Sequence, residues 1–318
     1  MIAYLTSFDD MQVMIPAINL QQVHKQYPNH TALLPTTFSI ASGSFFALLG
    51  PNGAGKSTLI NILSTITNKT SGKISVLGYD LDQQQAQAKL LMGVVPQEIN
   101  LNIFETPIET LVNQAAYYGV NQKDAISRGQ YLLEKLQLSE KQAAPIRTLS
   151  GGMKRRLMIA RALIHQPKIL ILDEPTAGVD VEIRQRIWQF LKQENQNGLT
   201  ILLTTHYLEE VEALCDDVAI LKDGQLVHQS HVHSVLEQAK HQSIIVETHK
   251  PIKDLPNLSP CKVKQIKPHS LAIELPQSYS LNQLFKQLTQ KNIIVTQVRQ
   301  ETNPVESLLL EIIQGKPA

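Results

Sequence analysis

The feature that most constrains this chain is a glycine-rich run between an apolar stretch ending at Leu49 and a helical pattern that continues through Ile66. It matches G-x-x-x-x-G-K-[ST] at Gly50, Pro51, Asn52, Gly53, Ala54, Gly55, Lys56, Ser57 and Thr58. In such a loop, glycines let backbone N–H groups face phosphate oxygens, and the helix start adds a positive dipole. We therefore predict a nucleoside triphosphate site, in which Lys56 contacts the β- and γ-phosphates and the Ser57 hydroxyl is a ligand of Mg²⁺.

A second motif supplies acidic side chains. The strand-like run Lys168–Leu172 is followed directly by Asp173 and Glu174. We expect Asp173 to hold Mg²⁺ through its water shell and Glu174 to act as the general base on the attacking water. For the segment alone, two acids that cap a following helix would be the preferred interpretation, but the phosphate loop favours the catalytic one.

The whole chain has the pattern of an α/β protein. Its 318 residues carry a net charge of +1, which gives no general attraction for nucleic acid or anionic lipid. Strand-like runs alternate with helical patterns, which predicts a mostly parallel sheet covered by helices. These runs are Ala17–Val23, Ser44–Leu49, Lys73–Leu77, Lys168–Leu172, Thr200–Thr204 and Val218–Leu221.

The pattern changes after about Gln238. Three strand-like runs are followed by a helix that Ser280 would cap, a further strand, and a final helix opened by Asn303. The strands are Ser243–Thr248, Cys261–Ile266, Ser270–Leu275 and Ile293–Val298. We predict an amino-terminal extension at 1–15, an α/β domain at 16–238, and a small α+β domain at 239–318.

One further motif leads to a family. Leu149-Ser-Gly-Gly-Met153 precedes a basic, apolar helix. Together with the phosphate loop and the acidic strand, it resembles the signature of the ATP-binding-cassette (ABC) ATPases, a group of P-loop NTPases. The resemblance covers roughly Ala17 to Val227. Four more positions match that family in order, namely Tyr27 (the aromatic that stacks on adenine), Gln97 (the Q-loop), Asp180 (the D-loop) and His206 (the switch histidine).

The resemblance implies roles for these residues. Ser150, Gly151 and Gly152 would donate hydrogen bonds to the γ-phosphate held by a facing subunit, so that two cassettes sandwich two ATP molecules. Gln97 would sense Mg²⁺ and the attacking water, and His206 would hold the γ-phosphate and fix the water with Glu174. The stretch of about 98–165 would be a helical subdomain. Read singly, Ser150 is an ordinary helix cap, Gln97 an exposed loop residue and Tyr27 a surface tyrosine.

The resemblance also indicates a subclass. Met153 replaces the glutamine most common in the family, and the Met form is frequent in two-component exporters, including bacterial drug-resistance pumps. No apolar run reaches the roughly 18 residues of a membrane span, and the amino terminus does not read as a secretory signal. We expect an ATP hydrolase that works as a homodimer at the cytoplasmic face of the cell membrane, with the permease on a separate chain. The alternatives are a soluble ABC ATPase acting on ribosomes or DNA, which the near-zero charge disfavours, and an importer ATPase.

Two other clusters have ordinary interpretations. His228, His231 and His233 follow a turn-like Asp-Gly, and we expect a solvated loop rather than a metal site. Lys154, Arg155 and Arg156 form one basic triplet, which we expect to face phosphates or a partner's acidic groups rather than nucleic acid.

Overall fold

The computed structural model describes residues 15–234, 242–252, 254–276 and 279–300. The chain divides into two compact units, Met1–Leu226 and Val227–Ala318, which are described separately. The expected domain limits at 15/16 and 238/239 stay a prediction. Most of the predicted extension and the predicted helix from Asn303 lie outside the described residues.

The centre of the first unit is a six-stranded sheet with the order β10-β9-β3-β8-β7-β6. From β9 to β6 all neighbouring strands are parallel. Every residue of β3, β7 and β8 is buried, as expected for strands covered on both faces. The strands are β3 (Phe45–Leu49), β6 (Met92–Val95), β7 (Ile169–Asp173), β8 (Thr200–Thr205), β9 (Asp217–Lys222) and β10 (Gln225–His231).

A second, antiparallel sheet has the order β2-β1-β4-β5. It comprises β1 (Ile18–Tyr27), β2 (His30–Ile40), β4 (Ser71–Val76) and β5 (Tyr79–Asp80). The runs Ala17–Val23 and Lys73–Leu77, which we expected in the mostly parallel sheet, belong here instead. The reason is that β1 and β2 are joined by a two-residue turn, and so short a connection can link only antiparallel strands.

Helix α1 (Lys56–Leu63) lies between the two sheets. Its buried side chains, Leu59, Ile60, Ile62 and Leu63, share one hydrophobic core with residues of both sheets, such as Leu20 and Leu48. The helix that follows the phosphate loop is therefore packed between the two sheets. This packing holds the backbone of Lys56, its first residue, in a fixed position.

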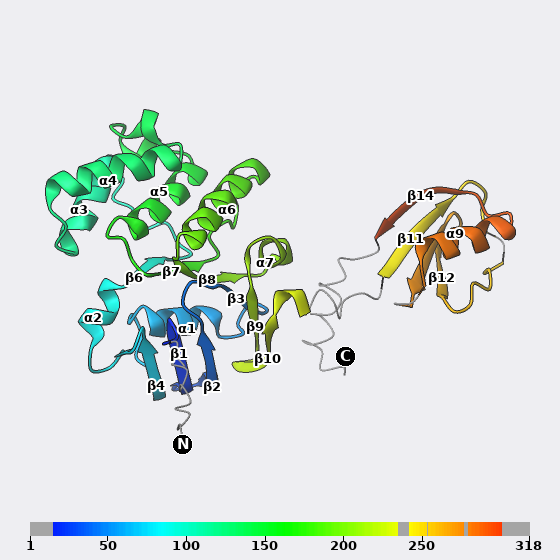
Figure 1. Cartoon of the computed structure of the whole chain (residues 1–318), viewed down its shortest axis with the longest axis horizontal. Helices are drawn as coiled ribbons and strands as arrows, with labels where there is room; N and C mark the ends of the chain where they lie inside the picture. Colours follow the sequence, from blue (N-terminus) through cyan, green and yellow to red (C-terminus); the bar gives the residue numbers. More distant parts are fainter. Residues whose placement is uncertain (1–14, 235–241, 253, 277–278, 301–318) are drawn as a thin grey trace, which may run out of the picture. The chain divides into compact units, whose positions relative to one another are not determined.

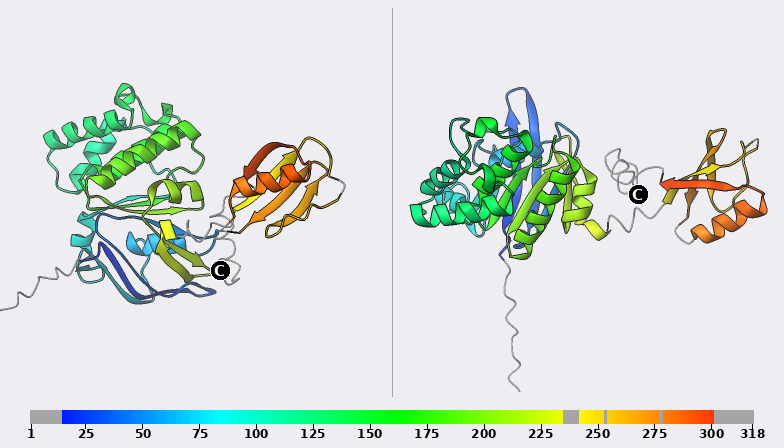
Figure 2. Two further views of the ribbon diagram at one scale, coloured as in Figure 1. Left: turned by 45° about the vertical axis from the view of Figure 1, so that its right-hand side comes forward. Right: turned by 90° about the horizontal axis from the view of Figure 1, so that it is seen from above.

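A group of helices lies on the other side of the six-stranded sheet from β1, β2 and β4, as Figures 1 and 2 show. Its members are α3 (Pro107–Tyr117), α4 (Gln122–Lys135) and α5 (Gly151–Leu163). Helix α3 begins with a capping box between Thr106 and Glu109. Three more helices, α2 (Gln85–Leu90), α6 (Val181–Gln196) and α7 (Leu208–Leu214), complete the unit. No helix in the described ranges is long and apolar enough to cross a membrane.

Two members of the basic triplet at the start of α5 do not face phosphates or a partner's acidic groups, contrary to what we expected for the triplet. The side chains of Arg155 and Arg156 are buried, with 4% and 6% of their residue surfaces exposed. Helix α5 is the inner helix of its group, and backbone carbonyl groups of neighbouring segments accept hydrogen bonds from both guanidinium groups.

The first two histidines of the cluster lie on a strand rather than in a loop, and His233 lies in the helical turn that follows it. Asp223 and Gly224 both have positive φ angles, 48° and 77°, which is the conformation of a two-residue turn between hairpin strands. His228 and His231 therefore lie on β10, and His228 Nε2 is 2.9 Å from Ser230 Oγ. The Asp-Gly pair after an apolar strand was the sequence signal for this hairpin.

The second unit contains a four-stranded antiparallel sheet with the order β12-β13-β11-β14. Its strands are β11 (Gln242–Thr248), β12 (Lys262–Lys267), β13 (Ser270–Leu275) and β14 (Val295–Gln300). Helix α9 (Leu281–Gln290) packs Leu284 and Leu288 into the core of this sheet. The predicted N-cap is confirmed, because Ser280 and Gln283 form a reciprocal capping box.

Candidate active site

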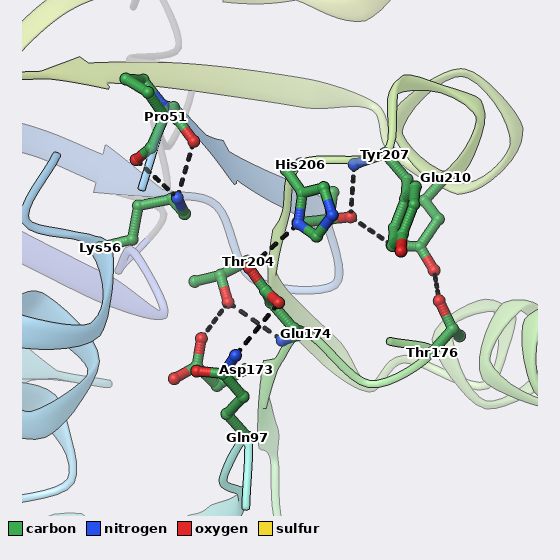
Figure 3. A network of polar contacts seen from close by, with 12 residues as sticks. Pro51, Lys56, Gln97, Asp173, Glu174, Thr176, Thr204, His206, Tyr207 and Glu210 are labelled. Carbon is green, nitrogen blue, oxygen red and sulfur yellow. Dashed lines mark hydrogen bonds and ion pairs between the residues drawn. The ribbon is translucent and has the colours of Figure 1, made fainter. Parts of the chain in front are cut away.

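The phosphate loop joins β3 to α1 in a conformation that only glycine adopts easily. Gly55 has a φ of 102°, and a Cβ atom there would lie 2.6 Å from the Ala32 carbonyl oxygen. The Lys56 side chain is buried, and its Nζ donates to the carbonyl oxygens of Gly50 at 2.6 Å and Pro51 at 3.0 Å (Figure 3). The loop thus holds a cation at the start of a helix, which is a binding arrangement for phosphate.

The charge of Lys56 depends on its neighbours. Burial lowers the pKa of the Lys56 ammonium group, while the nearby carboxylates of Glu174 and Asp173 act to raise the same pKa. The lysine and both acids are therefore close enough to interact electrostatically across one site. This is the arrangement that we predicted from two motifs far apart in the sequence.

Asp173 is the last residue of β7, and its carboxylate is buried. The Thr204 hydroxyl on β8 donates to Asp173 Oδ1, which fixes the carboxylate at the edge of the sheet. The backbone of Glu174 turns sharply there, with a φ of 47°, and its N–H donates to the Thr204 carbonyl at 3.1 Å. A left-handed conformation in a non-glycine residue costs energy, and such residues are often found at functional sites.

Three of the predicted residues meet at the Glu174 carboxylate. Gln97 Nε2 donates to Glu174 Oε2 at 3.3 Å, and His206 Nδ1 lies 3.1 Å from Glu174 Oε1 (Figure 3). These residues come from three segments, the loops after β6, β7 and β8. Parallel strands bring their carboxyl ends to the same edge of a sheet, so the fold itself assembles the group.

A pocket of about 620 Å³ lies between the phosphate loop and Glu174. The predicted residues in its lining are Asn52, Gly53, Gly55, Lys56, Ser57, Thr58, Gln97 and Glu174. Five lining residues were missed from the sequence, namely His30, Thr31, Ala32, Asp223 and Gly224. They lie at the start of β2 and in the turn between β9 and β10. The sequence signals for these two turns were the turn-forming pairs Pro28-Asn29 and Asp223-Gly224.

Tyr27 has a less direct relation to this pocket. Its ring stacks on that of His30, with the centroids 5.2 Å apart, and it is His30 that contributes to the lining. The Lys25 ammonium group lies 4.6 Å from the centroid of the same tyrosine ring. The role of Tyr27 in stacking on adenine stays a prediction.

The signature residues lie elsewhere on the unit. Ser150 is the N-cap of α5 and accepts a hydrogen bond from the Met153 N–H, and Asp180 caps α6 in the same way through the Ile183 N–H. The described lining of the pocket contains none of Ser150, Gly151, Gly152 and Asp180. Ser150 and Asp180 are exposed, so both helix starts are accessible to a second molecule.

The residues present fit a magnesium ion that binds together with phosphate. Mg²⁺ prefers oxygen ligands and is usually held by one or two protein groups plus phosphate oxygens and water. The Ser57 hydroxyl and the Asp173 carboxylate are oxygen groups of this kind, and they are the residues that would hold the ion. Among the described residues there is no group of three or more His, Cys, Asp or Glu side chains that could hold a metal by itself.

Comparisons with known proteins agree with this geometry. The sequence profile of the family described as "ABC transporter" matches residues 33–177. The linearmycin resistance ATP-binding protein LnrL of Bacillus subtilis (strain 168) is 42% identical over 210 residues, which are 66% of this chain and 68% of that protein. The chain belongs to the ABC transporter family. It is an ATP-binding and ATP-hydrolysing subunit of this class.

Other relatives of this ABC protein have export in their names. The Nod factor export ATP-binding protein I of Rhizobium etli is 39% identical over 229 residues, or 72% of each chain. Among solved structures, an ATP-binding subunit of an ABC transporter superposes with a TM-score of 0.65 at 28% identity, over 70% of this chain and 92% of the other. A dimeric ATP-binding cassette in a post-hydrolysis state, bound to ADP and Pi, has a TM-score of 0.63 at 26% identity, over 68% and 98%.

Proposed function

We propose that this ABC subunit powers the export of small molecules through a permease on a separate chain, working as a homodimer with Mg²⁺ and ATP at the cytoplasmic face of the membrane. The observation that carries the proposal is the meeting of Gln97, Glu174 and His206 beside the phosphate loop. The export direction is supported by the names of the relatives that confer linearmycin resistance or export Nod factor.

The chemistry follows from the side chains at the pocket. Lys56 binds the β- and γ-phosphates, while Ser57 and Asp173 hold Mg²⁺, which neutralises negative charge on the phosphate oxygens. Glu174 accepts a proton from the attacking water, and Gln97 and His206 keep its carboxylate in place through their hydrogen bonds. The side chain of His206 is more exposed than that of Glu174, 43% against 12%. His206 is therefore open to a ligand's phosphate.

The exposed starts of α5 and α6 support a dimer. Ser150 caps α5, and a helix start attracts anions through its free N–H groups and its dipole. The pocket of the same chain does not use these groups. In the proposed dimer, Ser150, Gly151 and Gly152 contact the γ-phosphate bound to the facing subunit, and Asp180 lies at the same interface.

Exposed apolar side chains support a membrane partner. The segment after Gln97 exposes Ile99, Ile103 and Phe104, and the end of α3 exposes Tyr117. Phe104 is 75% exposed and Tyr117 86%, which are the two highest exposures among the large apolar side chains of the described residues. We propose that the permease contacts these side chains, next to Gln97. A movement of the permease would then be transmitted to Gln97 and Glu174.

Two variants test the chemistry. Glu174→Gln keeps the shape of the side chain but removes the base, so we expect ATP binding to persist, turnover to fall by about a hundredfold or more, and a dimer to accumulate with ATP. Glu209→Gln, an exposed carboxylate on α7, is the matched control. Normal turnover in Glu174→Gln would reject the proposed base.

Membrane association tests the partner. The chain should copurify from membranes with a small hydrophobic protein, and Phe104→Ser combined with Tyr117→Ser should release it. Tyr131→Ser, a change at a partly exposed tyrosine on α4, is the control. Recovery only with ribosomes or with DNA would favour the soluble ABC ATPase instead.

A further inference from the structure

Arg155 joins the two segments that carry Gln97 and Glu174. It lies in the second turn of α5, only 4% exposed. Its guanidinium group donates to five backbone carbonyl oxygens, those of Pro96 (2.6 Å), Gln97 (3.1 Å), Asp173 (2.8 Å), Glu174 and Pro175 (2.8 Å). A guanidinium has five N–H donors, so each donor is matched by one acceptor.

The acceptors belong to two different loops. Nη1 reaches the loop after β6, at Pro96 and Gln97, whereas Nε and Nη2 reach the last residue of β7 and the loop that follows it. The side chains of Gln97 and Glu174 are themselves joined by a single hydrogen bond of 3.3 Å. The backbone on either side of that bond is therefore tied to one rigid, planar group.

Nearby carboxylates that Arg155 does not contact directly balance its positive charge. Burial lowers the pKa of the guanidinium, and the carboxylates of Asp173, Glu174 and Glu210 act against that change. A guanidinium remains protonated in proteins. Because the carbonyl groups it contacts are uncharged, it fixes the loops without forming an ion pair that would compete for the Glu174 carboxylate.

We infer that Arg155 is a positioning residue for ATP hydrolysis, which sets the placement of Gln97 relative to Glu174. Ser150 caps the same helix, so Arg155 also links the signature segment to both loops. The inference rests on the roles proposed above for Gln97 and Glu174. A purely structural arginine is the competing explanation, and the test must separate the two.

The neighbouring Arg156 provides a matched control. It is 6% exposed on the same helix, and its Nη1 donates to the Leu136 carbonyl at 2.7 Å, at the end of α4 rather than at either loop. Arg155→Gln and Arg156→Gln both remove a buried charge, so both should lower the melting temperature, Arg155→Gln by more because it loses five hydrogen bonds against one. Only Arg155→Gln should lower kcat, by at least about tenfold, with the affinity for a fluorescent ATP analogue within about twofold of the parent protein.

Three further measurements sharpen the test. Arg155→Lys keeps the charge but has three donors on one nitrogen, so it should fold and still have a low kcat. In a Gln97→Ala background, Arg155→Gln should cost less than about threefold in kcat, since both changes act on one group. Hydrogen exchange should accelerate in peptides covering 96–98 and 173–177 and not in the phosphate loop.

Several results would overturn the inference. They are an unchanged kcat in folded Arg155→Gln, equal kcat losses in the two arginine variants, full rescue by Arg155→Lys, or additive effects with Gln97→Ala. If Arg155→Gln does not fold, Arg155→Lys and its cycle with Gln97→Ala decide the question alone. Active Glu174→Gln would instead reject the proposed base, so the two failures are distinguishable.

Discussion

His206 Nδ1 lies 3.1 Å from Glu174 Oε1, which joins the loop after β8 to the loop after β7. In the proposed role of Glu174 as the base, its carboxylate would accept this hydrogen bond from the Nδ1–H group. The ring of His206 is then held in one orientation by the residue that we propose as the base.

His206→Ala should remove this support from Glu174. We expect kcat for ATP hydrolysis to fall by about a hundredfold, because both the placement of the base and a contact with phosphate are lost. The Kd for ATP should change little, since Lys56 is untouched. Steady-state kinetics and nucleotide titration measure the two effects, with His24→Ala on β1 as the control. Equal losses in both histidine variants would contradict the role.

Glu210 links three segments from inside the core. Its carboxylate oxygens accept hydrogen bonds from the hydroxyls of Thr176 and Thr205 and from Trp188 Nε1 at 3.2 Å. Glu210→Gln replaces one of these acceptor oxygens by an NH₂ group, which is a donor and cannot accept a hydrogen bond. We therefore expect the free energy of unfolding to fall by about 1–3 kcal/mol. Urea unfolding measures it, and the adjacent, exposed Glu209→Gln should lose less than about 0.5 kcal/mol.

His165 should make stability depend on pH. Its ring stacks on Tyr118, its Nε2 lies 3.1 Å from the Met92 carbonyl oxygen, and burial lowers the pKa of its imidazole from 6.5 to about 4. Between pH 6.5 and pH 4 the unfolded chain binds a proton at His165 that the folded chain does not. The contribution of the neutral, buried His165 to stability is therefore complete above pH 6.5 and is lost as the pH falls towards 4.

His165→Gln should flatten this dependence. The ring is partly exposed, so after allowing for solvent screening we expect wild type to lose about 1 kcal/mol more than the variant between pH 7.5 and pH 5. Urea unfolding at the two pH values measures the difference. The same loss in both proteins would assign the dependence to other groups.

Gly93 and Gly129 should respond differently to alanine. A Cβ at Gly93 on β6 would lie 2.2 Å from the Ala162 carbonyl oxygen of α5, where neither backbone can move easily. At Gly129 on α4 the nearest atom, at 2.9 Å, is the end of the Ile108 side chain, which can rotate. We expect Gly93→Ala to cost about 3 kcal/mol and Gly129→Ala about 1 kcal/mol or less, since alanine favours the helix. Thermal unfolding measures both, and equal costs would contradict this account.

The parts of the site that were predictable from sequence are local patterns. The loop from Gly50 to Thr58 follows a strand directly and the pair Asp173-Glu174 lies at the end of one, so the types of neighbouring residues define them. Gln97 and His206 needed the family resemblance, because a single glutamine or histidine in a loop has no distinctive pattern of its own.

The parts that were not predictable depend on contacts between distant segments. The lining of the pocket by His30 requires knowing that β1 and β2 form a hairpin outside the parallel sheet. Arg155 shows the same limit more clearly. A basic triplet usually indicates a solvated face, and only the packing of α5 against two loops reveals that its middle member is buried.

Helix α1, held between two sheets, has a consequence for timing. The part of the pocket that grips phosphate rests on this helix, while Gln97 extends from a loop and reaches Glu174 through one hydrogen bond. Retention of ATP and its cleavage therefore depend on different supports. A subunit built this way can bind ATP while hydrolysing it slowly, because the placement of Gln97 against Glu174, and not the support of the phosphate loop by α1, sets the rate of cleavage.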